Sequence, residues 1–270
     1  MRTLPGPCYV ISDAHLGIGP LEMERAFVRF LRSLEGRAAS LVINGDLFDF
    51  WFEWKSVIPR RSFRALAALA ELHDTGMPIL WVAGNHDCWG GNILREDVGA
   101  EYHIGDWSGE IAGWRTKVAH GDGLRDREDR WYRFIKPVMR NRVAIAAFRM
   151  LHPDRATSIA LGSSTASRVH RARDEGRGLR AIATDTLERE REVDLLIYGH
   201  SHIAALERTS TGGVFANAGS WLEAPTYLVI TGEKIELRKA KGSAEGDCLD
   251  SIDRRAEKAL PDPEELLRRV

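Results

Sequence analysis

The sequence predicts an α/β fold, and two features of its first third carry that prediction. Three short apolar runs alternate with two amphipathic stretches, which gives the order β-α-β-α-β over residues 8–87. Each run also ends in side chains that can bind a metal or exchange a proton. The carboxyl edge of the sheet is where α/β proteins hold their functional sites, so these ends are the first place to look for one.

The first predicted strand is Cys8–Ile11, and Asp13 and His15 lie in the turn after it. Alternate residues of an extended segment point the same way, so these two side chains share a face and could hold one metal ion. Taken alone, the pair is better explained as a turn aspartate beside an unrelated histidine. A helix follows over 21–34, predicted from apolar residues at helical spacing.

The second predicted strand begins at Leu41 and ends in an acidic turn. Asp46 lies at its tip, where a carboxylate could bridge two ions. Asp49 either orients a ligand or caps a helix. The aromatic residues of 50–54 either pack the core or form a wall that faces a substrate, and the sequence favours neither. A second helix is predicted over 60–75.

The third predicted strand, Ile79–Val82, runs into the turn Gly84-Asn85-His86-Asp87. Asn85 offers a neutral oxygen ligand, and His86 offers a titratable ring. These residue types are also common in turns, so the motif gains meaning only from ligands at other strand ends.

Two later strand ends supply such ligands. His120 follows a predicted strand over 116–119, and His200 and His202 follow another over 193–198. Closing strands over 214–221, 227–230 and 235–238 are predicted to be antiparallel, because no helix separates them.

The segment between His120 and His200 is predicted to be a helical cap, over about 124–190, inserted into a main domain over 1–240. Residues 124–180 hold 14 Lys and Arg against six Asp and Glu. This basic surplus is either a solvated face, as charge runs usually are, or a surface turned towards the site. Residues 241–270 are polar, and we expect an extension with one short helix there.

Composition narrows the classes of partner. The net charge of -1 gives no bulk attraction to nucleic acid or membranes. The three cysteines predict neither a disulfide framework nor a zinc knuckle. No apolar run approaches the ~20 residues that span a bilayer, and the first residues lack the pattern of a signal peptide. We therefore expect a cytoplasmic protein.

The ligand candidates combine two carboxylates, one amide and four imidazoles: Asp13, His15, Asp46, Asn85, His120, His200 and His202. Mixed oxygen and nitrogen ligands suit Mn, Fe, Co, Ni or Zn. Seven ligands are too many for one ion, but they suit two ions that share Asp46.

These motifs, in this order, resemble the full set of the calcineurin-like metallophosphoesterases, over residues 8 to about 230. The resemblance implies a two-sheet β-sandwich flanked by helices. It implies one metal on Asp13, His15 and His202, a second on Asn85, His120 and His200, and Asp46 as the bridge. His86 would be the catalytic histidine, supported by Asp49 and Asp87. Two ions ~3.5–4 Å apart would activate a shared water for in-line attack on phosphorus.

The cap gives a narrower resemblance, to the UDP-2,3-diacylglucosamine pyrophosphatases of lipid A synthesis. It rests on the Arg-rich sequence after Asp122, the Tyr132-x-Phe134 pair and the helical insertion. It implies cleavage of a diphosphate, acyl chains bound by the cap, and peripheral contact with the inner membrane as an alternative to a fully cytoplasmic location. The substrate-binding candidates are Arg125, Arg130, Tyr132, Arg133, Phe134 and Phe148. The best-known of these enzymes carry Arg where this chain has His86.

Three functions therefore stay open at this point. The first is a pyrophosphate hydrolase for a UDP-diacylglucosamine-like lipid, with two Mn ions as the expected cofactors and Fe, Zn, Co or Ni as alternatives. The second is a broader phosphodiesterase or phosphatase for nucleotides, nucleic acid or phosphoproteins. The third, a binding module without activity, is disfavoured because all seven ligands are present. A phosphorylated small molecule or lipid is the expected partner; nucleic acid is not, and no obligate protein partner is evident.

Overall fold

The protein is a sandwich of two β-sheets, seen in a computed structural model that describes residues 2–169 and 174–254. The seven-stranded sheet has the order β13 (Asp247–Asp253), β12 (Lys234–Lys239), β11 (Thr226–Ile230), β2 (Cys8–Ile11), β3 (Ser40–Asn44), β4 (Ile79–Val82), β5 (Glu101–His103). The six-stranded sheet has the order β1 (Thr3–Leu4), β6 (Trp107–Ile111), β7 (Trp114–Val118), β8 (Leu195–Tyr198), β10 (Val214–Asn217), β9 (Ala205–Arg208). The strands that precede the predicted ligands are parallel: β2, β3 and β4 in one sheet, β7 and β8 in the other.

The main core lies between the two sheets. Val10, Val42 and Leu80 of the first sheet pack against Val118 and Ile197 of the second, and all five are fully buried. Strands buried on both faces are apolar throughout, which is why β2 and β4 appear in the sequence as short unbroken apolar runs. Burial of this kind is the dominant favourable term in folding.

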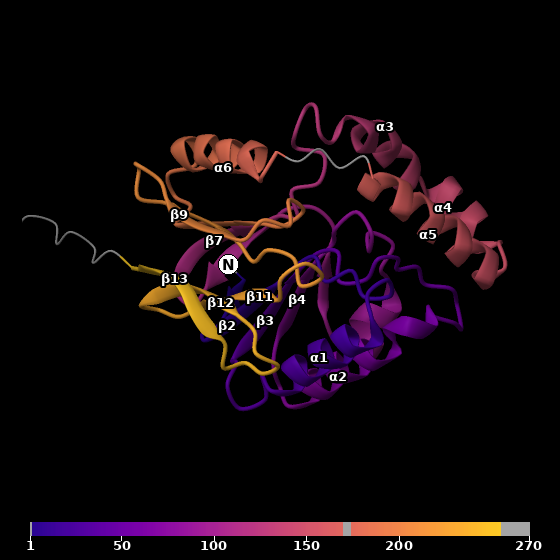
Figure 1. Cartoon of the computed structure of the whole chain (residues 1–270), viewed down its shortest axis with the longest axis horizontal. Coiled ribbons are helices and arrows are strands. Elements are labelled where there is room, and N and C mark those ends of the chain that lie inside the picture. Colours follow the sequence, from indigo (N-terminus) through magenta and orange to yellow (C-terminus); the bar gives the residue numbers. More distant parts are fainter. Residues whose placement is uncertain (1, 170–173, 255–270) are drawn as a thin grey trace, which may run out of the picture.

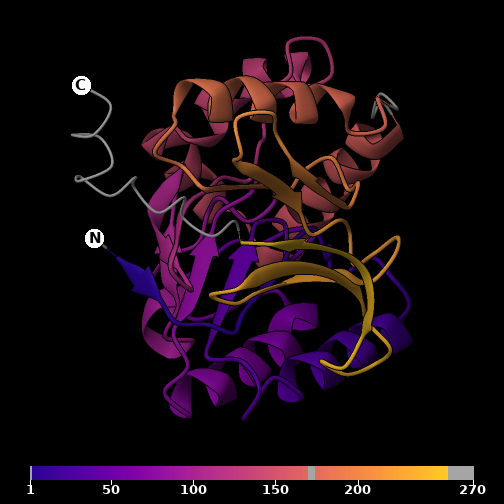
Figure 2. The same cartoon turned by 90° about the vertical axis from the view of Figure 1, so that its left-hand side faces the viewer.

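Helices cover both outer faces of the sandwich (Figure 2). On one face lie α1 (Leu21–Arg32), the 3₁₀ turn η1 (Arg60–Ser62) and α2 (Phe63–Asp74). On the other lies α6 (Arg177–Arg189), whose Leu179, Ala183 and Leu187 pack on β8 and β10. The π-helical turn η2 (Ile93–Asp97) precedes β5. The predicted α/β sandwich flanked by helices is confirmed.

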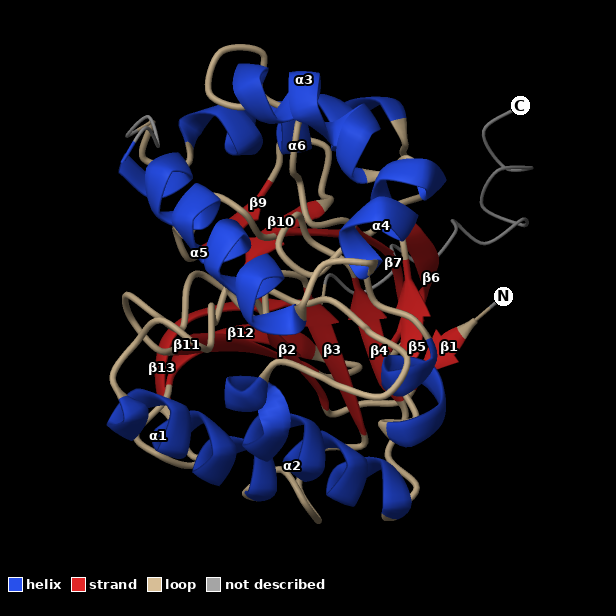
Figure 3. Cartoon of the chain, turned by 90° about the vertical axis from the view of Figure 1, so that its right-hand side faces the viewer, coloured by secondary structure: helices blue, strands red, loops and turns tan. Residues whose placement is uncertain are grey.

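Three further helices, α3 (Arg130–Met139), α4 (Arg142–Arg149) and α5 (Pro153–Val169), lie together at one side of the sandwich (Figure 3). Phe148 of α4 packs among Phe50, Phe52 and Trp89, with ring centroids 5.0 to 6.1 Å away. Ala156 of α5 joins the same cluster. The aromatic run of 50–54 therefore fastens this cap to the body, and the cap consists of α3 to α5, because α6 belongs to the sandwich.

The sequence missed some of the strands and one direction. β1, β5, β6 and β9 were not predicted. β10 is parallel to β8, not antiparallel, because the unpredicted β9 forms a hairpin with β10 and reverses the chain first. Past residue 241, where an extension with one short helix was expected, β13 pairs with β12 at the sheet edge. Any helix within 255–270 lies outside the described residues.

Candidate metal centre

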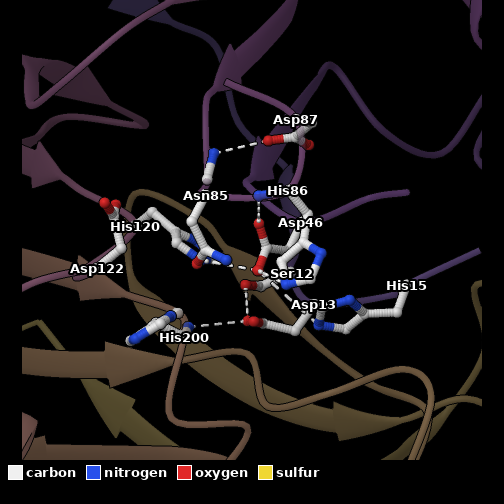
Figure 4. A network of polar contacts seen from close by, with 12 residues as sticks. Ser12, Asp13, His15, Asp46, Asn85, His86, Asp87, His120, Asp122 and His200 are labelled. Atoms are coloured by element: carbon white, nitrogen blue, oxygen red, sulfur yellow. Dashed lines mark hydrogen bonds and ion pairs between the residues drawn. The ribbon is translucent and has the colours of Figure 1, made fainter. Parts of the chain in front are cut away.

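All seven predicted ligands lie at the carboxyl ends of five parallel strands, where the two sheets meet (Figure 4). Asp13 and His15 follow β2, Asp46 follows β3 and Asn85 follows β4. His120 follows β7, and His200 and His202 follow β8. The alternation of strand and turn therefore brings residues that are up to 189 positions apart in the chain into one site.

Asp13, His15 and His202 form one group, whose ligand atoms lie within 4.8 Å of one another. The Nε2 atom of His202 is 3.3 Å from Asp13 Oδ1 and 3.1 Å from His15 Nε2. Two imidazole nitrogens that face each other beside a carboxylate are an arrangement that one cation can hold together.

Asp46, His120 and His200 form a second group within the same limit of 4.8 Å. Asp46 Oδ2 lies 3.2 Å from His120 Nε2 of this group and 3.8 Å from His15 Nε2 of the first. Asp46 therefore lies between the two groups, as a bridging carboxylate would.

Buried polar atoms without a partner test whether a metal fits here. Asp13 Oδ1, Asn85 Oδ1, His120 Nε2 and His200 Nδ1 are buried and accept or donate no hydrogen bond. Buried polar groups are almost always paired, so four orphans in one place need an explanation. All four belong to predicted ligands and come from different strand ends. The residues present fit a centre for two metal ions.

Each histidine of the centre is also held by its other ring nitrogen. Asp49 lies 3.3 Å from His15 Nδ1, and the Asn44 carbonyl accepts from His120 Nδ1 at 2.9 Å. Asp129 and Glu223 lie 3.1 Å from His200 Nε2 and His202 Nδ1, respectively. Such partners fix the ring orientation and leave the inner nitrogen free for a metal. Of these partners only Asp49 was predicted, because no local motif marks the other residues.

Backbone strain is concentrated at the same residues. Among the described residues, seven other than glycine have positive φ, and five of them are predicted ligands: Asp13, His15, Asp46, His200 and His202. Such conformations cost about 1–3 kcal/mol each and persist where the surroundings enforce them. Gly84 is required by close approach, because a Cβ there would lie 2.2 Å from Asp46 Oδ1.

The predicted catalytic residues take distinct places. His86 Nδ1 donates to the Asp49 carbonyl at 2.6 Å, and its Nε2 lies 4.0 Å from Asp46 Oδ2. The Asp87 carboxylate instead accepts from the backbone N–H groups of Gly84 and Leu47 and from the Trp81 indole. Asp87 therefore holds the shape of the turn that presents Asn85 and His86, and burial raises its pKa to about 6.

The buried charges divide the histidines into two kinds. Burial lowers the pKa of His15 to about 4, so this ring is neutral at pH 7. Burial alone would also lower the pKa of His120. The charges of Asp46 and Asp13 outweigh that effect and hold the pKa of His120 well above its usual value. In the metal-free protein, His120 is therefore the ligand that a proton occupies at neutral pH.

We expect the affinity for Mn to rise about tenfold per pH unit between pH 6 and pH 8, because the ion must displace one proton from His120. Calorimetric titration in two buffers of different ionisation enthalpy counts the released protons. A constant affinity over this range, with no proton release, would contradict the assignment.

The predicted substrate residues lie on or beside the cap. Arg130, Arg133 and Phe134 are exposed on α3, and the Arg133 guanidinium pairs with Asp126. Tyr132 is half-buried, and Phe148 belongs to the aromatic cluster. Arg125 differs from its prediction, because it is only 5% exposed and its guanidinium binds Asp129 and Asp174.

A cavity of about 760 Å³ opens beside the centre. Its walls include Asp49 next to the metal ligands, Phe50 and Trp54 of the aromatic cluster, and Pro153 and Thr157 of α5. The cavity therefore lies between cap and body and leads away from the centre along largely apolar walls.

Comparison with known proteins agrees with this geometry. Residues 6–204 match the profile of the family described as Calcineurin-like phosphoesterase. The UDP-2,3-diacylglucosamine hydrolase of Porphyromonas gingivalis is 30% identical over 250 residues, covering 85% of this chain and 95% of that protein. The protein of the same name from Neisseria meningitidis serogroup A is 31% identical over 200 residues, covering 73% and 82%. Among solved structures, Chaetomium thermophilum Vps29 aligns with a TM-score of 0.47 at 12% identity, covering 94% of this chain and 98% of that chain. The chain therefore belongs to the calcineurin-like phosphoesterase family, as a metal-dependent phosphoester or pyrophosphate hydrolase.

Proposed function

We propose that the protein hydrolyses the diphosphate of a UDP-diacylglucosamine-like substrate. The observation that carries this proposal is the position of the apolar-walled cavity, which shares Asp49 with the support of the metal centre. A substrate that is charged at one end and acylated at the other would fill both. Relatives named UDP-2,3-diacylglucosamine hydrolase, similar over most of the chain, support the same substrate class.

In the proposed reaction, a water oxygen bonds to the phosphorus on the uridine side, and the bond from that phosphorus to the bridging oxygen breaks. The products are UMP and the acylated sugar 1-phosphate. Two divalent ions, of which we propose Mn first and Fe, Zn, Co or Ni as alternatives, would supply activation of the water and neutralise phosphoryl charge.

The chain's own residues would orient this chemistry. Asp13, His15 and His202 would hold one ion, Asn85, His120 and His200 the other, and Asp46 both. The Asp49 carbonyl fixes the proton of His86 on Nδ1, which leaves Nε2 facing the centre. In that position Nε2 would contact the phosphoryl oxygens and stabilise the charge that develops on them.

The cap would bind the remainder of the substrate. Arg130 and Arg133 lie on exposed positions of α3, where guanidinium groups can pair with phosphate oxygens. We propose Tyr132, Phe134 and Phe148 as contacts for the apolar part. Arg125 is omitted, because its guanidinium is already bound by two carboxylates.

We also propose that the cap contacts the cytoplasmic surface of the inner membrane. Trp131, Phe134 and Val138 of α3 and Val143 and Met150 of α4 are 58–85% exposed. Exposed apolar groups of this size mixed with arginine are typical of helices that lie in a membrane interface. None of the helices among the described residues is both long and apolar enough to cross a bilayer.

The test is release of UMP from UDP-diacylglucosamine by pure protein, with Mn and with chelator. We expect turnover with Mn, its loss on chelation, and a fall of at least about 10²-fold in kcat/KM for UDP-N-acetylglucosamine, which lacks the long acyl chains. Turnover of aryl phosphodiesters with none of the lipid substrate would instead support the broader phosphodiesterase. A salt-sensitive shift of DNA would support a nuclease.

A further inference from the structure

A buried ion pair outside the metal ligands connects the cap to His200. Arg125 and Asp129 are 5% and 3% exposed. The guanidinium donates to both carboxylate oxygens of Asp129, through Nη2 at 2.7 Å and Nε at 3.3 Å. Asp129 Oδ1 also lies 3.1 Å from His200 Nε2. One carboxylate oxygen is thus shared between an arginine of the cap entrance and a predicted metal ligand.

Asp129 stands at the N-cap position of α3, but its side chain does not cap the helix. An aspartate there ordinarily accepts from the N–H groups of the first turn. Asp129 Oδ2 instead accepts from the backbone N–H groups of Gly123 and Arg125, at 3.1 and 3.0 Å. The carboxylate is therefore directed back towards His200 by the loop that enters the cap.

Arg125 also reaches the exit of the cap. Its Nη1 atom donates to Asp174 Oδ1 at 3.3 Å. Asp174 in turn accepts from the backbone N–H groups of Gly176 and Gly178, at 3.0 Å each, where α6 begins. The entrance loop, the exit loop and His200 therefore meet at one guanidinium.

We propose that Arg125 and Asp129 are positioning residues that couple the placement of the cap to metal binding at His200. With Asp129 accepting from Nε2–H, the His200 ring carries its proton there and presents Nδ1 to the ion, and Nδ1 is the buried atom that lacks a partner. The inference rests on the metal centre proposed above. By reciprocity, an ion that orders His200 also orders Asp129 and the start of α3.

The test measures Mn binding and hydrogen exchange in the full-length protein. We expect Asp129→Asn to weaken one of two Mn sites about 10–100-fold and to leave the other unchanged. In the wild type, Mn is expected to slow amide exchange over residues 123–139, and in Asp129→Asn this effect disappears. Arg125→Lys keeps the charge but loses the two-pronged contact, so it should fold and show a smaller loss at the same site.

Two controls separate positioning from general stability. Glu223→Gln should weaken the other site, since Glu223 holds His202, without changing exchange in the cap. Asp185→Asn breaks an exposed ion pair with Arg189 on α6 and should change neither readout. If wild type binds two Mn ions and both variants of the ion pair bind them equally well, the coupling is overturned. If wild type binds no Mn, the proposed centre itself fails.

Discussion

Asp46→Asn is expected to lower kcat/KM by about 10³-fold and to weaken binding of both metal ions. Asp46 Oδ1 accepts from the backbone N–H of His86 at 2.9 Å, so the asparagine oxygen would keep that place. Its NH₂ group would then stand where Oδ2 faces Nε2 of His120 and of His15, at 3.2 and 3.8 Å. A donor at the point shared by two cations repels both of them.

The measurement pairs steady-state kinetics with Mn titration. Asp185→Asn is the matched control, because it makes the same chemical change to an exposed carboxylate on α6. Loss of activity with both ions still bound at wild-type affinity would contradict the bridging role, since it would place the defect after metal binding.

The strands that carry the ligands could be predicted because their burial makes them visible. β2 and β4 are enclosed on both faces, so their sequences are unbroken apolar runs whose ends mark the site. β9 and β13 lie at sheet edges and are partly exposed, and their mixed sequences give no comparable signal. Missing β9 is also why the direction of β10 was wrong.

The partners of the ligands could not be predicted for a different reason. Asp129 reaches His200 across 71 residues of chain, and Glu223 reaches His202 across 21. Neither pair has a fixed spacing, because each is set by how the cap entrance or a loop after β10 folds back. Arg125 shows the same limit: in the sequence it is one arginine in a basic run, and only tertiary contacts distinguish it as buried.

His86→Gln is expected to lower kcat by about 10²–10⁴-fold while both metal ions bind as in the wild type. His86 is not needed as a ligand in the proposed centre, and its Nδ1 is held by the Asp49 carbonyl. Glutamine keeps a hydrogen-bond donor but can neither carry a positive charge nor transfer a proton. His73→Gln on α2 is the control, since it makes the same change away from the centre.

His86→Arg then decides what the histidine contributes, because arginine supplies charge but no proton. A diphosphate releases a phosphate monoester, whose second pKa is about 6, so that leaving group needs no acid. We therefore expect His86→Arg to restore turnover of UDP-diacylglucosamine to within about tenfold of the wild type. An alkyl phosphodiester releases an alkoxide that must be protonated, so the same variant should stay as slow as His86→Gln on that substrate. Equal rescue on both substrates would assign His86 to charge stabilisation alone. Failure on both would make it a proton donor and would weaken the case for a diphosphate as the substrate.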